Sequence, residues 1–143
     1  MAKILYGEDI IKLLPDLFCD TLLAKKIYDQ TVNESKNTLV LIENRINITY
    51  MGIKRGASFL CVWFMRSFCR GLIAFSMLKE KVFSLNVLNC CEEFLKRYPE
   101  YDYIIGECQK LERLPTNDWK HLEVIAKTAL DIYMKIGERE MGW

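Results

Sequence analysis

The sequence has a single histidine, His121, and none of its six cysteines forms a CxxC pair. It also lacks a Gly-rich phosphate loop, a GxSxG motif and an HExxH motif. A zinc site would need three or four converging cysteines, and the spacing of the cysteines does not indicate one. A cysteine nucleophile with His121 as its base is the enzymatic alternative that these residues leave open. The sequence predicts a protein that is not an enzyme, with no catalytic residues, metal ligands or cofactor.

A strong charge of either sign is missing as well. Lysine and arginine total 20 and aspartate and glutamate total 19, so the formal net charge is +1. This balance provides no general field for nucleic acid or an acidic membrane, and any charge-driven partner must use a local patch. Glu8 and Asp9 fall where a signal peptide needs an uninterrupted apolar region, which predicts a protein that is not secreted. The cysteines are then expected to be free, buried thiols in a reducing compartment; they are Cys19, Cys61, Cys69, Cys90, Cys91 and Cys108.

Apolar residues, by contrast, are plentiful and recur at helical spacing almost throughout. The chain has 143 residues, of which 51% are apolar, which is enough for one domain, residues 1–143, with a substantial core. The periodicity predicts about seven helices, with apolar faces in residues 10–28, 39–50, 57–67, 72–83, 87–95, 104–111 and 119–136. No convincing strand pair is seen. The predicted fold class is an all-α, single-domain helical bundle around a central apolar helix, residues 72–83.

Several residues predict where these helices begin and end. Pro15 interrupts the first helix, and the polar run 31–37 is read as a loop. Gly52 and Gly56 flank a segment, IKR, that is read as a basic turn. Pro99 disfavours helical geometry in the residue before it, so the fifth apolar stripe is expected to end at position 98. The last helix is expected to follow a cap at Thr116 or Asn117 and to stop at Gly137.

Two arginines, Arg66 and Arg70, stand within a run of large apolar side chains that includes Trp63. A buried core helix would normally exclude an unpaired guanidinium, so each arginine needs water or a partner. At the rim of an aromatic-lined surface, it could pair with a carboxylate that a ligand helix brings. The alternative is that both side chains reach past apolar neighbours to solvent, or form internal ion pairs with residues such as Glu43.

The segment 58–75 carries a family resemblance. It reads SFLCVWFMRSFCRGLIAF and resembles the first homology segment of the Bcl-2 family, in which an aromatic-rich helix leads into Asn-Trp-Gly-Arg and an apolar run such as Ile-Val-Ala-Phe. LIAF at 72–75 matches that run. FCRG at 68–71 departs from the signature, because the tryptophan is absent and glycine and arginine exchange order. A one-residue shift rotates a helical side chain by about 100°, so either Arg70 or Arg66 takes the place of the family arginine.

A second segment resembles the same family. NDWKHL at 117–122 is similar to the second homology segment, a Gly-Gly-Trp followed by an apolar residue, with Asn117 and Asp118 in place of the glycines. The order and separation of the two segments suit the family, and the resemblance covers residues 57–133. It implies a bundle with a surface groove that captures the homology-3 helix of pro-apoptotic Bcl-2 relatives.

The resemblance also implies which residues form the groove. Arg70, or otherwise Arg66, would pair with the aspartate of the ligand, and Gly71 would allow close helix approach. Leu72 and Phe75 would line the groove floor. The full set of expected groove residues is Ile46 and Tyr50 on a facing helix, with Phe59, Leu60, Trp63, Phe64, Arg66, Phe68, Arg70, Gly71, Leu72 and Phe75.

The last residues of the sequence and its aromatic residues bear on membrane attachment and self-association. The last residues, YMKIGEREMGW, contain no apolar membrane anchor, so the chain is most similar to the tail-less apoptosis inhibitors of large DNA viruses, of the iridovirus kind. Such a protein would act in the host cytoplasm and reach mitochondria through its partners. Aromatics around a groove could also support a homodimer. The alternative function is a Bcl-2-like helical interaction module without a working groove, which would modulate host signalling through its surface.

Overall fold

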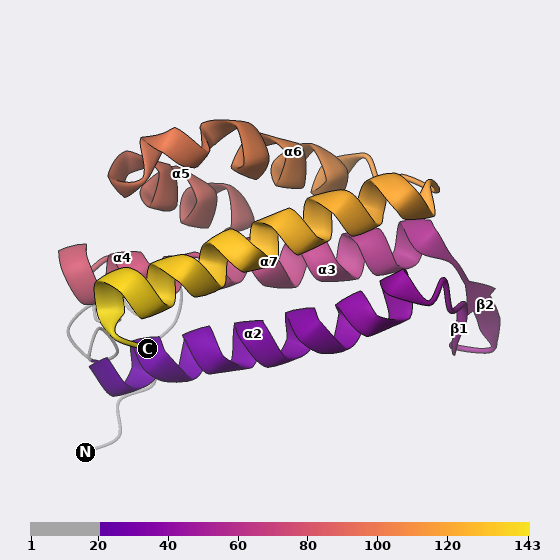
Figure 1. Ribbon diagram of the computed structural model, residues 1–143, viewed down its shortest axis with the longest axis horizontal. Helices are drawn as coiled ribbons and strands as arrows, with labels where there is room; N and C mark the ends of the chain where they lie inside the picture. The colour runs from indigo at the N-terminus through magenta and orange to yellow at the C-terminus, as the bar shows by residue number, and fades with distance from the viewer. Residues whose placement is uncertain (1–20) are drawn as a thin grey trace, which may run out of the picture.

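The computed structural model describes residues 21–143, and these residues are mostly helical (Figure 1). The predicted apolar face at residues 10–18 and Cys19 lie outside them. The elements in chain order are α2 (Thr21–Glu43), β1 (Ile48–Tyr50), β2 (Ile53–Arg55), α3 (Ala57–Gly71), α4 (Ile73–Glu80), α5 (Val87–Arg97), the 3-10 turn η1 (Pro99–Tyr101), α6 (Asp102–Arg113) and α7 (Trp119–Met141). The all-α class is confirmed for the described residues, apart from the short strand pair.

Helix α3 lies at the centre of the bundle. It packs against α2, α5, α6 and α7, whereas α4 packs mainly against α2 and α5 (Figure 1). The prediction that residues 72–83 form the central helix is therefore wrong. Residues 72–77 are buried on every side, but α4 ends at Glu80 with Lys81 in the left-handed conformation. Val82 and Phe83 then belong to the following loop.

Helices α3 and α4 form a nearly continuous apolar stretch that breaks at Leu72. Among residues 21–143, Ala57–Glu80 is the one stretch long and apolar enough to cross a membrane, but 61% of its most apolar window is buried inside the bundle. A central helix of a globular core passes the same test of length and composition. Its burial indicates that this stretch serves as the centre of the core.

Helix α2 runs without interruption through residues 31–37, so the predicted loop there is wrong. The polar residues Thr31, Ser35 and Thr38 are buried on the same face as Tyr28 and Ile42. These five positions follow the three- and four-residue spacing of one helix face. The Thr38 hydroxyl also donates a hydrogen bond to the Glu34 carbonyl at 2.9 Å, which satisfies one buried polar group within the helix. Small polar side chains thus replace apolar ones where α2 approaches its neighbours.

Residues 48–55 form an antiparallel hairpin, which corrects both the helix expected up to residue 50 and the basic turn expected at IKR. Tyr50 pairs with Ile53 and Ile48 with Arg55. Met51 and Gly52, at the turn, have φ values of 52° and 76°, as a two-residue type I′ hairpin turn requires. The β-branched residues on either side favour extended backbone.

The helices after residue 86 follow the sequence pattern more closely. Helix α5 ends at Arg97, with residue 98 as its C-cap, and α6 ends two residues before Pro115, as predicted. The predicted cap of the last helix at Thr116 or Asn117 is wrong, because the Asp118 side chain accepts hydrogen bonds from the Lys120 and His121 amides. The predicted stop at Gly137 is also wrong, since α7 continues to Met141.

Candidate functional site

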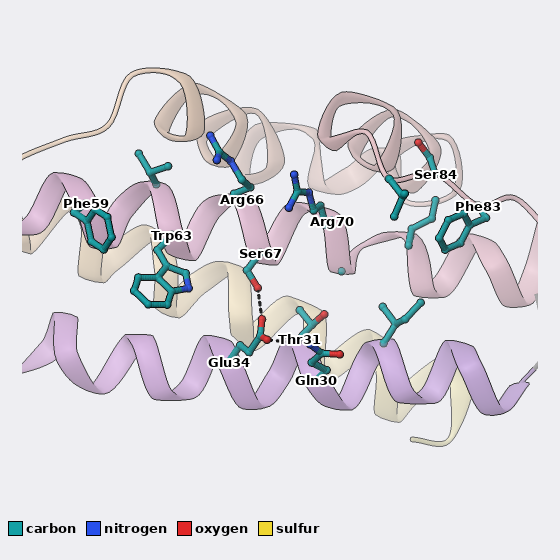
Figure 2. A pocket seen from close by; sticks show the side chains of 15 residues that line it. Gln30, Thr31, Glu34, Phe59, Trp63, Arg66, Ser67, Arg70, Phe83 and Ser84 are labelled. Carbon is teal, nitrogen blue, oxygen red and sulfur yellow. Dashed lines mark hydrogen bonds between the residues drawn. The ribbon is translucent and has the colours of Figure 1, made fainter. Parts of the chain in front are cut away.

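A groove opens between α2 and α3 and has a volume of about 620 Å³ (Figure 2). Its size lies within the usual range of ligand sites in proteins. Helix α3 forms one wall, α2 forms the other, and the loop after α4 closes one end. The lining residues are Ile27, Gln30, Thr31 and Glu34 from α2, Phe59, Val62, Trp63, Arg66, Ser67, Arg70 and Gly71 from α3, and Ile73, Phe83, Ser84 and Leu85 beyond it.

One end of the groove is aromatic. Phe59 and Trp63 lie on successive turns of α3, and their rings meet edge to face with centroids 5.5 Å apart (Figure 2). Tyr50 of the hairpin contacts Phe59 from outside, with centroids 5.4 Å apart. Trp63 remains 47% exposed. This end therefore offers a half-covered aromatic surface to an apolar ligand group.

The middle of the groove is polar and joins its two walls. The Ser67 hydroxyl donates a hydrogen bond to Glu34 Oε2 at 2.7 Å, and Gln30 Nε2 donates one to Glu34 Oε1 at 3.0 Å (Figure 2). Both carboxylate oxygens of Glu34 are therefore engaged. This link holds α2 and α3 together along the groove, and an incoming ligand would pass over it or displace it.

The two groove arginines differ in their partners. Arg66 Nε lies 3.4 Å from Glu112 Oε1 of α6, in an ion pair whose arginine side chain is half exposed. Arg70 lines the groove and is exposed, and it forms no ion pair within residues 21–143. The alternative of an internal ion pair is therefore found for Arg66, with Glu112 as the partner, whereas the Glu43 carboxylate lies 3.3 Å from Lys127 Nζ. Arg70 is thus the cation that can accept a ligand carboxylate without losing an existing partner.

The structure divides the predicted groove residues into two sets. Phe59, Trp63, Arg66, Arg70 and Gly71 line the groove together. The others from α3 and α4 do not line it, because their side chains are buried in the core of the bundle; they are Leu60, Phe64, Phe68, Leu72 and Phe75. Charge is the signal that could have separated the two faces of α3, because Arg66 and Arg70 share three- and four-residue spacing with the groove residues Phe59 and Trp63 and not with the buried aromatics.

The residues predicted on a facing helix also take other positions. Ile46 is exposed on the connection between α2 and β1, and Tyr50 belongs to β1. The facing helix is instead α2, which contributes Ile27, Thr31 and Glu34 at spacings of four and three residues. This spacing is itself the signal of a helix face, but the polar run 31–37 conceals it in the apolar pattern.

Helices α2 and α3 cross closely at Gly71. A Cβ atom at this position would overlap the Thr31 side chain of α2. Glycine therefore lets α2 and α3 approach at the end of the groove next to Arg70. This crossing is between two helices of the chain itself, and the role of Gly71 toward a ligand helix stays a prediction.

A second hollow lies at the far end of α5, where charges are largely paired. Arg97 contacts Glu80 at 2.9 Å, and the Tyr98 hydroxyl donates a hydrogen bond to Glu140 Oε2 at 3.1 Å. Burial, together with this carboxylate, raises the pKa of Tyr98 to about 12, although Arg97 opposes the shift. The pairing indicates a structural role that ties α4, α5 and α7 together.

The described thiols lie in the interior of the bundle. All five, Cys61, Cys69, Cys90, Cys91 and Cys108, are free and buried. Burial raises the pKa of the Cys90 thiol to about 12 and also raises the pKa of Cys108, whereas reactive cysteines have lowered values. His121 is exposed at the start of α7. Within residues 21–143, no group of histidine, cysteine, aspartate and glutamate side chains could hold a metal ion.

Comparison with known proteins identifies no relative. No family model, no curated protein and no solved structure matches this chain. A functional interpretation therefore depends on the geometry of the groove and on the sequence resemblance described above.

Proposed function

We propose that this chain is an anti-apoptotic protein with a Bcl-2-like fold, which sequesters the homology-3 helix of pro-apoptotic Bcl-2 relatives in the groove between α2 and α3. The observation that carries the proposal is the position of Arg70, an exposed cation without an ion-pair partner in the described residues, beside an aromatic-lined groove. Sequestration would bury the death-promoting helix, which could then neither activate nor neutralise its usual targets.

The spacing along α3 suits an amphipathic ligand helix. Trp63 and Arg70 are seven residues apart in the same helix, which corresponds to about 10 Å along its axis. An apolar residue and an acidic residue that are seven positions apart on a ligand helix span the same distance. The ligand would place apolar side chains against Phe59 and Trp63 and its aspartate against Arg70.

The remaining parts of the proposal follow from the family resemblance. As a diverged inhibitor of the kind carried by large DNA viruses, the protein would act in the host cytoplasm and reach mitochondria through its pro-apoptotic partners. Self-association through exposed aromatics remains a prediction. Sedimentation equilibrium at increasing protein concentration would test it.

Titration calorimetry with a panel of homology-3 peptides tests the proposed function. The unmodified protein should bind at least one peptide with one-to-one stoichiometry. Arg70→Ala should weaken that binding by about 2 kcal/mol or more, because a buried ligand carboxylate would lose its partner. Arg66→Ala should have a smaller effect, since Arg66 already pairs with Glu112. Arg113→Ala, which removes an exposed arginine of α6 outside the groove, is the matched control. Absence of heat with every peptide, from a protein with unchanged helical circular dichroism, would reject the proposal.

One observation favours a second candidate, a Bcl-2-like interaction module without a working groove that acts on host signalling proteins through its surface. The Ser67 to Glu34 hydrogen bond joins the two walls, and the Glu34 carboxylate would repel an acidic ligand residue. Ser67→Ala removes this link without adding bulk. Peptide binding that appears only in Ser67→Ala would show that the native groove is closed and would support the second candidate.

A further inference from the structure

The hairpin of β1 and β2 exposes apolar side chains at its tip. It projects from one end of the bundle, at the right of the view in Figure 1. Met51 is 81% exposed, the largest fraction among the large apolar residues described, and Ile53 and Tyr50 beside it are about half exposed. Large apolar side chains gathered at a protruding point are unusual on a monomer surface and mark a contact site.

The backbone of the tip holds Met51 outward at a conformational cost. Its φ of 52° lies in the left-handed region, which side chains other than Gly, Asn and Asp seldom adopt. Asn-Gly is the preferred pair for this type of turn, and it would supply the same geometry with less strain. An apolar side chain in a strained and exposed position is an observation that points to a function.

Cations lie along the hairpin and at its base. Residues 44–79 contain no aspartate or glutamate and six cations, and three of these, Arg45, Lys54 and Arg55, belong to the hairpin or the connection before it. Glu43, the last carboxylate before this stretch, is paired with Lys127. Arg55 also lies over the Phe59 ring, with its guanidinium carbon 5.5 Å from the ring centroid. The local charge is therefore positive although the whole chain is nearly neutral.

We propose that this hairpin docks on the surface of membranes rich in anionic phospholipid. The tip would enter the interface between headgroups and acyl chains while the exposed side chains of Arg45 and Lys54 contact the phosphates. A strand of three residues extends about 10 Å, which matches the depth of that interface. A specific protein partner would need an interface of about 20–30 residues a side, whereas this tip is small and convex. A lipid surface requires no complementary cavity.

Vesicle co-sedimentation tests the proposal with the complete chain. The protein should sediment with vesicles of mixed phosphatidylcholine and phosphatidylserine, should not sediment with pure phosphatidylcholine, and should be released by high salt. Met51→Asn creates the favoured Asn-Gly turn, so the fold is retained while binding falls by about tenfold. Lys54→Gln should weaken binding by about fivefold.

Matched controls remove similar groups elsewhere. Tyr103→Asn takes away an exposed apolar side chain of α6, and Lys36→Gln takes away an exposed cation of α2; neither should change sedimentation. Equal binding of Met51→Asn and the unmodified protein would overturn the proposal, as would equal binding to neutral vesicles. The proposal would also be overturned if the unmodified protein sediments without vesicles and Met51→Asn does not. The tip would then contact a second copy of the chain.

Discussion

The Tyr133 hydroxyl donates a hydrogen bond of 2.6 Å to the Gly71 carbonyl, and it thereby joins α7 to the point where α3 meets α4. Tyr133 is fully buried, and burial raises the pKa of its phenol well above the ordinary value. Its ring stacks on Tyr28 of α2 at a centroid distance of 5.1 Å. Tyr133 of α7 therefore contacts both the break between α3 and α4 and helix α2.

Replacement of Tyr133 by phenylalanine should destabilise the protein by about 1–3 kcal/mol, because the buried Gly71 carbonyl would lose its hydrogen-bond donor. The aromatic stacking would remain. Urea unfolding followed by circular dichroism measures the change. Tyr103→Phe, at a site that is 78% exposed, is the control and should leave the free energy of unfolding unchanged. Equal stability of the two variants would contradict the assigned role of the hydroxyl.

Two helical glycines should respond oppositely to alanine. Gly71→Ala should lower the free energy of unfolding by about 1–3 kcal/mol, because the new methyl group overlaps Thr31. Gly106 of α6 has open space where a Cβ would lie, so Gly106→Ala should raise stability by about 0.5–1 kcal/mol. Thermal and urea unfolding of both variants provide the measurement. A stable Gly71→Ala protein would show that α2 and α3 do not cross closely.

The neighbouring aromatics Trp63 and Phe64 should separate binding from folding. Trp63→Ala should cost about 1 kcal/mol of stability or less, because its ring is half exposed and its edge contact is with Phe59. Phe64, which is 1% exposed, lies in the core, so Phe64→Ala should cost about 3–5 kcal/mol. Urea unfolding and peptide titration of both variants test this division. Unfolding of the Trp63→Ala protein would place that residue in the core.

Alkaline pH should weaken the fold partly through Tyr98. Its pKa is about 12 in the folded state and 10 in the reference state, so the neutral phenol is favoured by folding. The unfolded chain releases its proton first, and the contribution of Tyr98 is present below pH 10 and lost as the pH rises to about 12. Urea unfolding as a function of pH should show a shallower decline for Tyr98→Phe than for the unmodified protein. Identical pH profiles would indicate that Tyr98 does not contribute.

Much of the helical framework could be predicted from sequence because its signals are local. Apolar spacing and Pro99 indicate α5 and its end, and Ala57 marks the start of α3. The apolar pattern wrongly predicts a loop within α2, because the buried face of this helix includes Thr31, Ser35 and Thr38. These residues are small enough for the neighbouring helices to pack closely against α2. Because they are polar, a search for the spacing of apolar residues does not detect them. The hairpin was missed because Met51 supplies a turn conformation usually supplied by asparagine.

The candidate site was predicted on one wall only. Phe59, Trp63 and Arg70 are predictable because aromatic and charged side chains within one apolar run are typical of a binding surface. Glu34 and Ile27 on the opposite wall were not identified, because their role depends on tertiary packing between α2 and α3. The burial of Phe64 on the other face of α3 likewise depends on α5, α6 and α7, which no local pattern specifies.

The pairing of α2 with α7 has a consequence for how the protein is made in the cell. The Tyr28 ring packs against the backbone of Gly137, so one side of α2 is completed by α7, a helix made after α3, α4, α5 and α6. Tyr28 and Gly137 lie 109 residues apart in the sequence, and a ribosome needs roughly 5–20 s to add that many residues. During that time α2 can pack against α3 and α4, which follow it in the chain and contact it in the folded protein, but its side facing α7 stays uncovered. The surface of α2 around Tyr28 is therefore completed only after the residues of α7 have been added.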